Sequence, residues 1–364
     1  MASDRPRIPP RPLVRAIESV RAVLAVVFRK LVPGHIALME LMAAGWISQA
    51  IHAAASLQIA DELAAGPRTN AELAAAVGAD QDALRRLLRL LISYGIFTQR
   101  ADGRYALTPM AQALRRDAEV SLRDAMLFFG STGHRNHWSH LVDAVRTGRP
   151  VGEKLYGMSF FDYVRHDREL GELFDRAMTS INTLAMEPLL AAYDFGRHAT
   201  IVDVGGGEGA LLTEILRRAP HSHGILFDLP EVVASAPTRF TELGLADRCT
   251  VEGGSFFDTV PQGGDAYILK HIVHDWAEPE ASRILRTVRA AMAPDARLLI
   301  IELVVPEHTA PHPSKFIDLE MLVNVGGRER TESEYRDLLA RHGFTLTRLV
   351  PTISPDNVLV AVPS

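Results

Sequence analysis

The segment from Val202 to Gly209, Val-Asp-Val-Gly-Gly-Gly-Glu-Gly, constrains the fold of this chain more than any other. An apolar run leads into an acidic residue and then into glycines at every second position. Gly205, Gly207 and Gly209 allow a tight turn and a close approach of backbone N–H groups to a ligand. The run from Ala210 to Arg218 that follows has a helical pattern. The segment therefore predicts a strand, a ligand-binding turn and a helix.

The glycine turn alone leaves the ligand open, because Gly205-x-Gly207-x-x-Ala210 also satisfies the dinucleotide fingerprint of dehydrogenases. Asp228 follows the next apolar run and is placed to accept both hydroxyls of a ribose in either case. Asp203 separates the two interpretations. Its carboxylate would repel a pyrophosphate but would attract a ligand that carries an ammonium and a sulfonium. We therefore expect S-adenosylmethionine as the cofactor and S-adenosylhomocysteine as its product.

The C-terminal half alternates between strand and helix patterns, which predicts a doubly wound α/β sheet. In such a sheet the ligand lies beyond the carboxyl ends of the strands. The expected strands are 201–204, 224–227, 249–253, 266–270 and 297–303, with a final pair near 344–350 and 357–362.

The N-terminal half predicts a winged helix. Helical spacing runs from Leu41 to Leu63 and from Asn70 to Val77, and Asp80 is placed to cap a third helix that ends at Gly95. A hairpin pattern with the turn 101–103 follows. Such a unit often reads DNA, and the arginines available for phosphate contacts are Arg85, Arg86 and Arg89. The formal net charge of −5 and the many apolar helical faces favour subunit pairing instead.

Two further features bear on location. Cys249 is the single cysteine, so an intrachain disulfide is excluded and a reducing cytoplasm is the expected setting. The N-terminal residues from Arg5 to Pro33 are rich in arginine, and the stretch 13–32 is basic and amphipathic. We expect this stretch to pack on the body or on a partner subunit rather than on a membrane surface, and no segment has a membrane-spanning length free of charge.

The fourth expected strand leads into Lys-His-Ile-Val-His-Asp-Trp, residues 270–276. His274 is the strongest candidate for a base that takes the proton of a hydroxyl as it attacks a methyl group. A histidine that caps the next helix is the alternative. Glu302, expected to end the fifth strand, needs a partner because it stands among aliphatic residues. Glu329 lies in a polar loop, and a carboxylate near the imidazole would fix its tautomer and stabilise the imidazolium.

These motifs, in this order, resemble the caffeate-type, acetylserotonin-type and bacterial polyketide-type family of S-adenosylmethionine-dependent O-methyltransferases. The motifs are 202–209, Phe-Asp-Leu-Pro-Glu-Val at 227–232, the run 270–276, Glu302 and Gly-Gly-Arg-Glu-Arg-Thr at 326–331. The resemblance implies a homodimeric enzyme of secondary metabolism, with a winged-helix dimerisation domain before a methyltransferase domain. It further implies that His274 is the general base and that Glu302 and Glu329 flank it.

The resemblance also implies the cofactor contacts and leaves the acceptor pocket to be proposed. The expected cofactor residues are Asp203, Gly205, Gly207, Asp228, Leu229, Ser255, Phe256 and Lys270. Many relatives carry an acid where this chain has Ser255, so a hydroxyl would replace a carboxylate contact to adenine. The candidate pocket walls are Phe128, Trp138, Phe161, Met178, Met321 and Asn324.

Metal is not expected, because a histidine base needs no ion to lower the pKa of the acceptor. His134, His137 and His140 lie at helical spacing, but no acid or cysteine completes a ligand set there.

The resulting prediction divides the chain into a basic extension (1–34), a winged-helix dimerisation domain (35–115), a helical linker that contributes to the pocket (116–195) and a methyltransferase domain (196–364). The expected reaction moves a methyl group from S-adenosylmethionine to a hydroxyl of a small aromatic or polyketide-like acceptor. Two alternatives stay open: an enzyme that uses the bound cofactor without transfer, as in some hydroxylases and decarboxylases, and a winged-helix regulator that senses the cofactor. No nucleic-acid partner is expected.

Overall fold

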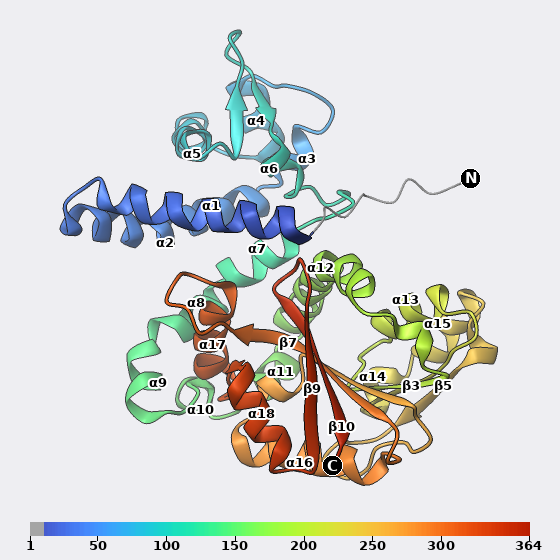
Figure 1. The fold of residues 1–364 in the computed structure, drawn as a ribbon. Coiled ribbons are helices and arrows are strands. Elements are labelled where there is room, and N and C mark those ends of the chain that lie inside the picture. The colour runs from blue at the N-terminus through green and yellow to red at the C-terminus, as the bar shows by residue number, and fades with distance from the viewer. Residues whose placement is uncertain (1–10) are drawn as a thin grey trace. The chain divides into compact units, whose positions relative to one another are not determined.

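A computed structural model of the chain describes residues 11–364, shown in Figure 1; the first ten residues of the expected basic extension lie outside the described part. The chain forms two compact units. The first comprises the described residues up to Ile17, Val142–Val151 and Ala185–Ser364, and the second comprises Glu18–Leu141 and Gly152–Leu184.

The second unit contains the expected helices and hairpin. Its helices include α2 (Gly34–Ser56), α3 (Ile59–Glu62), α4 (Asn70–Val77) and α5 (Gln81–Ser93), and its hairpin pairs β1 (Phe97–Gln99) with β2 (Tyr105–Leu107). Thr69 and Glu72 form a capping box on α4, and the Asp80 side chain caps α5 by accepting from the N–H of Ala83 at 2.8 Å. The local sequence therefore fixes where both helices begin.

One expectation for this unit is wrong. Helical spacing predicted a continuous helix from Leu41 to Leu63, but α2 begins earlier, at Gly34, and ends at Ser56. Gln58 then adopts a left-handed conformation with φ of 55°, and α3 begins at the next residue, Ile59. A periodic apolar pattern continues across such a break, so the pattern does not reveal it.

Helices also account for most of the segment from Val120 to Leu190, as expected. They are α7 (Arg123–Gly130), α8 (Thr132–Ser139), α9 (Leu141–Thr147), α10 (Gly152–Tyr156), α11 (Phe160–His166) and α12 (Arg168–Ala192); α1 (Arg11–Lys30) and α6 (Pro109–Gln112) precede them.

The first unit is built on an eight-stranded sheet with the order β5-β4-β3-β6-β7-β10-β9, in which β8 pairs with β7. The strands are β3 (Thr200–Val204), β4 (His223–Asp228), β5 (Cys249–Gly253), β6 (Ala266–Lys270), β7 (Arg297–Val305), β8 (Arg330–Thr331), β9 (Phe344–Pro351) and β10 (Asp356–Pro363). Strands β5, β4, β3, β6 and β7 are parallel, whereas β10 is antiparallel to β7 and β9. The expected doubly wound sheet is confirmed.

Helices cover both faces of this sheet (Figure 1). On one face, α16 (Glu278–Ala291) and α18 (Glu332–Ala340) bury Leu298 and Ile300 of β7. On the other, α13 (Ala210–Arg218) and α15 (Ala236–Glu242) belong to the core that contains Leu299 and Ile301. Successive residues of β7 are therefore all apolar here, because alternate side chains enter two separate cores. The remaining elements are α14 (Pro230–Val233), α17 (Pro313–Asn324) and three 3₁₀ turns, η1 (Phe195–Arg197), η2 (Ala246–Arg248) and η3 (Val273–Asp275).

Candidate active site

The glycine turn between β3 and α13 has the geometry that the sequence predicts. Gly205, Gly207 and Gly209 have φ values of 70°, 59° and 79°, which side chains disfavour. A Cβ atom on Gly205 would lie 2.5 Å from Ile272, whereas one on Gly207 would meet nothing within 4 Å. Gly207 thus leaves open space beside its Cα atom, in the turn that leads into α13.

Asp228 closes the neighbouring strand β4. One carboxylate oxygen accepts from the N–H of Gly207 at 2.8 Å and the other from the N–H of Leu229 at 2.7 Å. Burial raises the pKa of Asp228, although these two bonds counteract the effect. The carboxylate therefore connects the glycine turn to the end of β4, and each oxygen retains a lone pair that suits a ribose hydroxyl.

Asp203 lies almost completely buried in β3, with one oxygen that has no hydrogen-bond partner. Burial raises its pKa to about 7, Lys270 counteracts this, and Asp228 adds to it. An orphaned acceptor beneath a glycine turn fits a ligand that brings hydrogen-bond donors and positive charge, so the site fits the expected cofactor. Lys270 ends β6, and burial lowers its pKa against the opposing influence of Asp356 and Asp203.

His271 follows Lys270 in an unusual conformation. Its φ of 53° is one of two positive values among the described non-glycine residues, a form that costs energy and concentrates at functional sites. Its backbone N–H donates to Ile301, and its Nε2 lies 3.0 Å from Asp356 Oδ1, at the start of β10. Nδ1 lies 3.4 Å from Lys270 Nζ. These contacts hold the bend that directs the next residues toward the sheet edge.

His274 is buried in η3, and both of its ring nitrogens face carboxylates. Nδ1 lies 2.7 Å from Glu329 Oε1, and Nε2 lies 3.4 Å from Asp275 Oδ1. Burial lowers the pKa of His274, but Asp275, Glu329 and Glu302 outweigh it and raise the value to about 10. Burial raises the pKa of Glu329 to about 7, opposed by His274. This is the arrangement of an imidazole that attracts and holds a proton.

Glu302 differs from its predicted place and contact. It lies inside β7 rather than at the end of the strand, because β7 continues to Val305. Its Oε1 accepts from the backbone N–H groups of His274 and Ile272, at 3.1 and 3.2 Å, and Oε2 accepts from the hydroxyl of Tyr335. Glu302 therefore finds the partner it requires, but it holds the backbone of η3 and makes no hydrogen bond to the imidazole.

Ser255 and Phe256 follow β5. The Ser255 hydroxyl accepts from the N–H of Phe257 at 3.2 Å, and Phe256 packs against Phe257 and Trp276 with ring centroids 4.9 and 6.1 Å apart. A ring atom of Phe256 also lies 3.4 Å from a Cβ built on Gly205. This apolar group therefore lies beside the glycine turn, as a cofactor contact requires, and Leu229 is partly exposed at the neighbouring strand end.

The six candidate pocket residues divide between the two units. Met321 and Asn324 lie on α17 in the unit that contains the sheet, and Asn324 is buried with its amide donating to Glu320 O at 3.1 Å. Phe128, Trp138, Phe161 and Met178 lie on α7, α8, α11 and α12 of the other unit. Phe128 is enclosed by Phe129, His134 and Phe174, at 5.3 Å from each ring, and so also serves as core.

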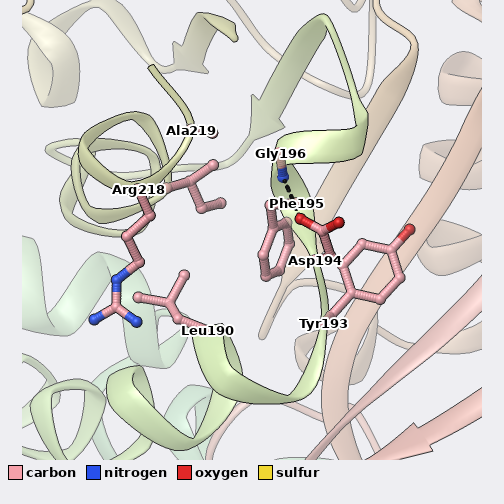
Figure 2. Close-up of a pocket in the computed structure, with 8 residues that line it drawn as sticks. Leu190, Tyr193, Asp194, Phe195, Gly196, Arg218 and Ala219 are labelled. Atoms are coloured by element: carbon pink, nitrogen blue, oxygen red, sulfur yellow. Dashed lines mark hydrogen bonds between the residues drawn. The ribbon is translucent and has the colours of Figure 1, made fainter. Parts of the chain in front are cut away.

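A separate pocket, shown in Figure 2, lies at the far end of α13 from the glycine turn. Leu190, Tyr193 and Phe195 are among the residues that line it, and Asp194 accepts from the N–H of Gly196 at 3.1 Å. Arg218 and Ala219, which also line it, end a helix about 13 Å long. The length of α13 thus separates this pocket from the glycine turn. Among residues 11–364, no group of three or more side chains is arranged to hold a metal ion.

Sequence reasoning missed several residues around His274. Asp275 stands next to it in the chain and has a pKa that burial raises to about 6, opposed by His274. Arg330, Tyr335 and Asp356 reach the site from β8, α18 and β10. Arg330 stands in the quoted motif 326–331, which gave it no role, and no short-range signal marks Tyr335 and Asp356, because the register of the sheet and the packing of α18 bring them in.

Comparison with known proteins agrees with this geometry. The chain matches the O-methyltransferase domain over residues 138–345 and the O-methyltransferase dimerisation domain over residues 39–117. It is 39% identical to a phenazine O-methyltransferase of Lysobacter antibioticus, over 90% of this chain and 95% of that one. It is 38% identical to the 8-amino-8-demethylriboflavin N,N-dimethyltransferase of Streptomyces davaonensis, over 83% and 87%.

Solved structures give the same assignment. Human N-acetylserotonin methyltransferase, determined in complex with S-adenosylmethionine, superimposes with a TM-score of 0.83 at 28% identity and covers 92% of this chain and 98% of its own. The chain therefore belongs to the family of S-adenosylmethionine-dependent O-methyltransferases that join an N-terminal dimerisation domain to a C-terminal methyltransferase domain.

Proposed function

We propose that this enzyme transfers the methyl group of S-adenosylmethionine to a hydroxyl of a small aromatic or polyketide-like acceptor, with His274 as the general base. The observation that carries the proposal is the buried imidazole 2.7 Å from Glu329, at the same sheet edge as the glycine turn. S-adenosylmethionine, when bound, supplies an electrophilic methyl group on a cationic sulfur.

The residues that would hold the cofactor surround β3, β4 and β6. The open space beside Gly207 leaves room for the nucleoside, the lone pairs of Asp228 suit its hydroxyls, and buried Asp203 suits a cationic group. Leu229, Ser255 and Phe256 would provide the side chains that contact the adenine ring. Gly205 allows the tight turn, and Lys270 places its amino group where it interacts with the Asp203 carboxylate.

His274 would move the proton. In its neutral form with Nδ1–H donating to Glu329, Nε2 accepts the proton of the acceptor hydroxyl as the oxygen–carbon bond forms and the sulfur–carbon bond breaks. Glu329 and Asp275 then stabilise the imidazolium. Because the sulfonium loses its charge during transfer, a buried and water-poor site favours the reaction. General-base assistance of this kind contributes roughly 10²–10⁴-fold.

For the acceptor we propose a chemical class and not a single compound. We place Phe128, Trp138, Phe161, Met178, Met321 and Asn324 among the residues that select it, since aromatic and apolar side chains with few polar groups are typical of pockets for aromatic ligands. The riboflavin-type relative modifies an amine, so amines are the second acceptor class to test. We also propose a cytoplasmic location, which the single cysteine supports.

Calorimetric titration with S-adenosylmethionine and S-adenosylhomocysteine, followed by a labelled-methyl screen over phenols, naphthols and aromatic amines, tests this function. We expect binding of both cofactor forms and transfer to a hydroxyl. His274→Gln should lower turnover at least a hundredfold with cofactor affinity nearly unchanged, whereas the control His308→Gln, in an exposed loop, should not. Unchanged turnover in His274→Gln would remove His274 as the base.

A further inference from the structure

Arg330 is a buried cation that the proposed function does not use. Its side chain is 2% exposed, and it is among the largest fully buried side chains of the described chain. Taking a guanidinium out of water is costly unless hydrogen bonds and an opposite charge compensate it. The groups that contact the Arg330 guanidinium therefore indicate its role.

The contacts of Arg330 point in three directions. Nη1 lies 3.4 Å from the carbonyl oxygens of Val273 and Arg328, and Nη2 lies 3.3 Å from Glu278 Oε2. The guanidinium also lies over the ring of Tyr335, 5.9 Å from its centroid. Glu278, in the first turn of α16, accepts from Arg341 as well, at 2.5 Å. Burial raises the pKa of Glu278, but its bonds to Arg341 and Arg330 outweigh this, so the carboxylate stays charged.

These contacts reach the segments that carry His274 and Glu329, the imidazole and the carboxylate of the candidate active site. Val273 immediately precedes His274 in η3, and Arg330 immediately follows Glu329. The Arg328 N–H, in the same loop, donates to the His274 carbonyl at 2.8 Å. Tyr335 donates to Glu302, whose other oxygen accepts from the His274 N–H. Arg330 thus joins the loop that carries Glu329 to the turn that carries His274.

We propose that Arg330 is a positioning residue for transfer, which fixes the separation of His274 and Glu329. The kinetic consequence rests on the proposed function, whereas the positioning itself concerns only this pair. A hydrogen bond of 2.7 Å between imidazole and carboxylate requires both backbones to be held in register, and a planar guanidinium can contact several groups in fixed directions. A lysine at this place would supply the positive charge, but its ammonium would not fix the directions of its hydrogen bonds as a guanidinium does.

The experiment compares Arg330→Met and Arg330→Lys with Arg341→Met. Arg341 contacts the same Glu278 carboxylate but is exposed and has no hydrogen bond or ion pair to η3, so it is a matched control. Arg330→Met should lower the maximal kcat of the pH profile roughly 10–100-fold while the Kd for S-adenosylmethionine changes less than about twofold, and Arg330→Lys should recover part of the loss. Arg341→Met should stay near the unmodified enzyme.

The pH dependence separates positioning from general stability. The ionisable groups that face His274 are Asp275 beside it, Glu329 from the loop before β8, Glu302 from β7 and His271 before η3. Loosening only the Glu329 contact should therefore move the acid limb of kcat/KM to lower pH. A merely structural role would lower the melting temperature and leave this limb in place.

A second readout does not depend on activity. NMR titration of the dimer labelled with ¹⁵N-histidine, with His274 assigned from the His274→Gln variant, should show a lower imidazole pKa in Arg330→Met than in Arg341→Met. If the unmodified protein methylates no acceptor but this difference appears, the proposed function fails and the positioning role stands. The proposal is overturned if Arg330→Met titrates like Arg341→Met. Should Arg330→Met fail to fold, Arg330→Lys and Glu278→Gln provide the same comparison.

Discussion

His274 is the residue on which the chemistry depends, and its surroundings set the pH at which it can work. Two carboxylates face its ring nitrogens, and together with Glu302 they outweigh burial and raise its pKa to about 10. A base must be neutral to accept a proton, so only the deprotonated fraction of the free enzyme can react with a neutral acceptor. We therefore expect kcat/KM to rise with pH well above the ordinary titration range of histidine.

Glu329→Gln tests this at the residue level. Removing the carboxylate lowers the pKa of His274, so the acid limb of the kcat/KM profile should move to lower pH, and the maximal rate should fall roughly 10–100-fold because the imidazolium loses a stabilising partner. Glu280→Gln, at an exposed position on α16, should match the unmodified enzyme. An acid limb that stays in place in Glu329→Gln would contradict the role of this carboxylate.

Asp203 gives a second prediction at this scale. Burial raises its pKa to about 7, and a bound cation favours the charged carboxylate, so binding should release a proton. Affinity for S-adenosylmethionine should accordingly rise as the pH increases from about 5 to 7. Calorimetry in buffers of different ionisation enthalpy measures the number of protons released on binding. Asp203→Asn should bind more weakly and lose the pH dependence; a pH-independent affinity in the unmodified protein would refute the assignment.

At the scale of elements, the site depends on how the 326–331 loop docks on η3. A Cβ built on Gly327 would lie 1.9 Å from the His274 carbonyl oxygen, an impossible distance. The loop therefore approaches η3 only because residue 327 is glycine. This contact, and not the sequence of either segment alone, brings Glu329 to the imidazole.

Gly327→Ala should separate the loop from η3. We expect turnover to fall at least as far as in Glu329→Gln, while calorimetric affinity for S-adenosylhomocysteine stays within a few-fold, because the glycine turn at β3 is untouched. Gly196→Ala, where the nearest atoms lie 3.4 Å away, is the control. Equal turnover in the two variants would show that the close approach has no role in catalysis.

The difference between local sequence pattern and contacts between distant segments explains what the sequence could and could not predict. The strands β3 to β7 were placed within about two residues, because their apolar runs are short and bounded by turn signals. Glu302 was placed at a strand end, because a charged residue after four aliphatic ones suggests a boundary. It lies inside β7 because Tyr335 and two backbone N–H groups satisfy it from elements distant in sequence. The two-residue strand β8 and the contacts of Arg330 are likewise tertiary and have no local pattern.

At the scale of the whole molecule, the helices that precede the hairpin carry a large exposed apolar surface. Exposed side chains on α2 include Leu38, Met39, Leu41, Met42 and Trp46. By length and composition α2 is also the one helix of the described chain that could cross a membrane, with a mean hydropathy of 1.2. Because residues 39–117 match a dimerisation domain, we propose that a second copy of the chain covers this surface in a homodimer.

Trp46→Glu tests this assembly. A charge in a buried apolar interface is strongly unfavourable, so the variant should dissociate toward monomers in light scattering coupled to size exclusion. Arg86→Glu, at an exposed position on α5, should remain dimeric. A Trp46→Glu protein that stays dimeric would place the interface elsewhere, and flotation of the unmodified protein with lipid vesicles would assign the surface to a membrane instead.

Proton removal by His274 during methyl transfer is the step on which the proposed catalysis depends most. The direct measurement is single-turnover transfer of a labelled methyl group to a phenolic acceptor, followed from pH 6 to 10 in the unmodified enzyme and in His274→Gln. We expect the unmodified rate to rise with pH as the imidazole loses its proton. At a pH where the imidazole is neutral and the phenol is still protonated, the variant should be slower by roughly 10²-fold or more, and the difference should shrink once the phenol ionises by itself. Equal rates in the two proteins over this whole pH range, with the cofactor bound in both, would show that His274 does not remove the proton.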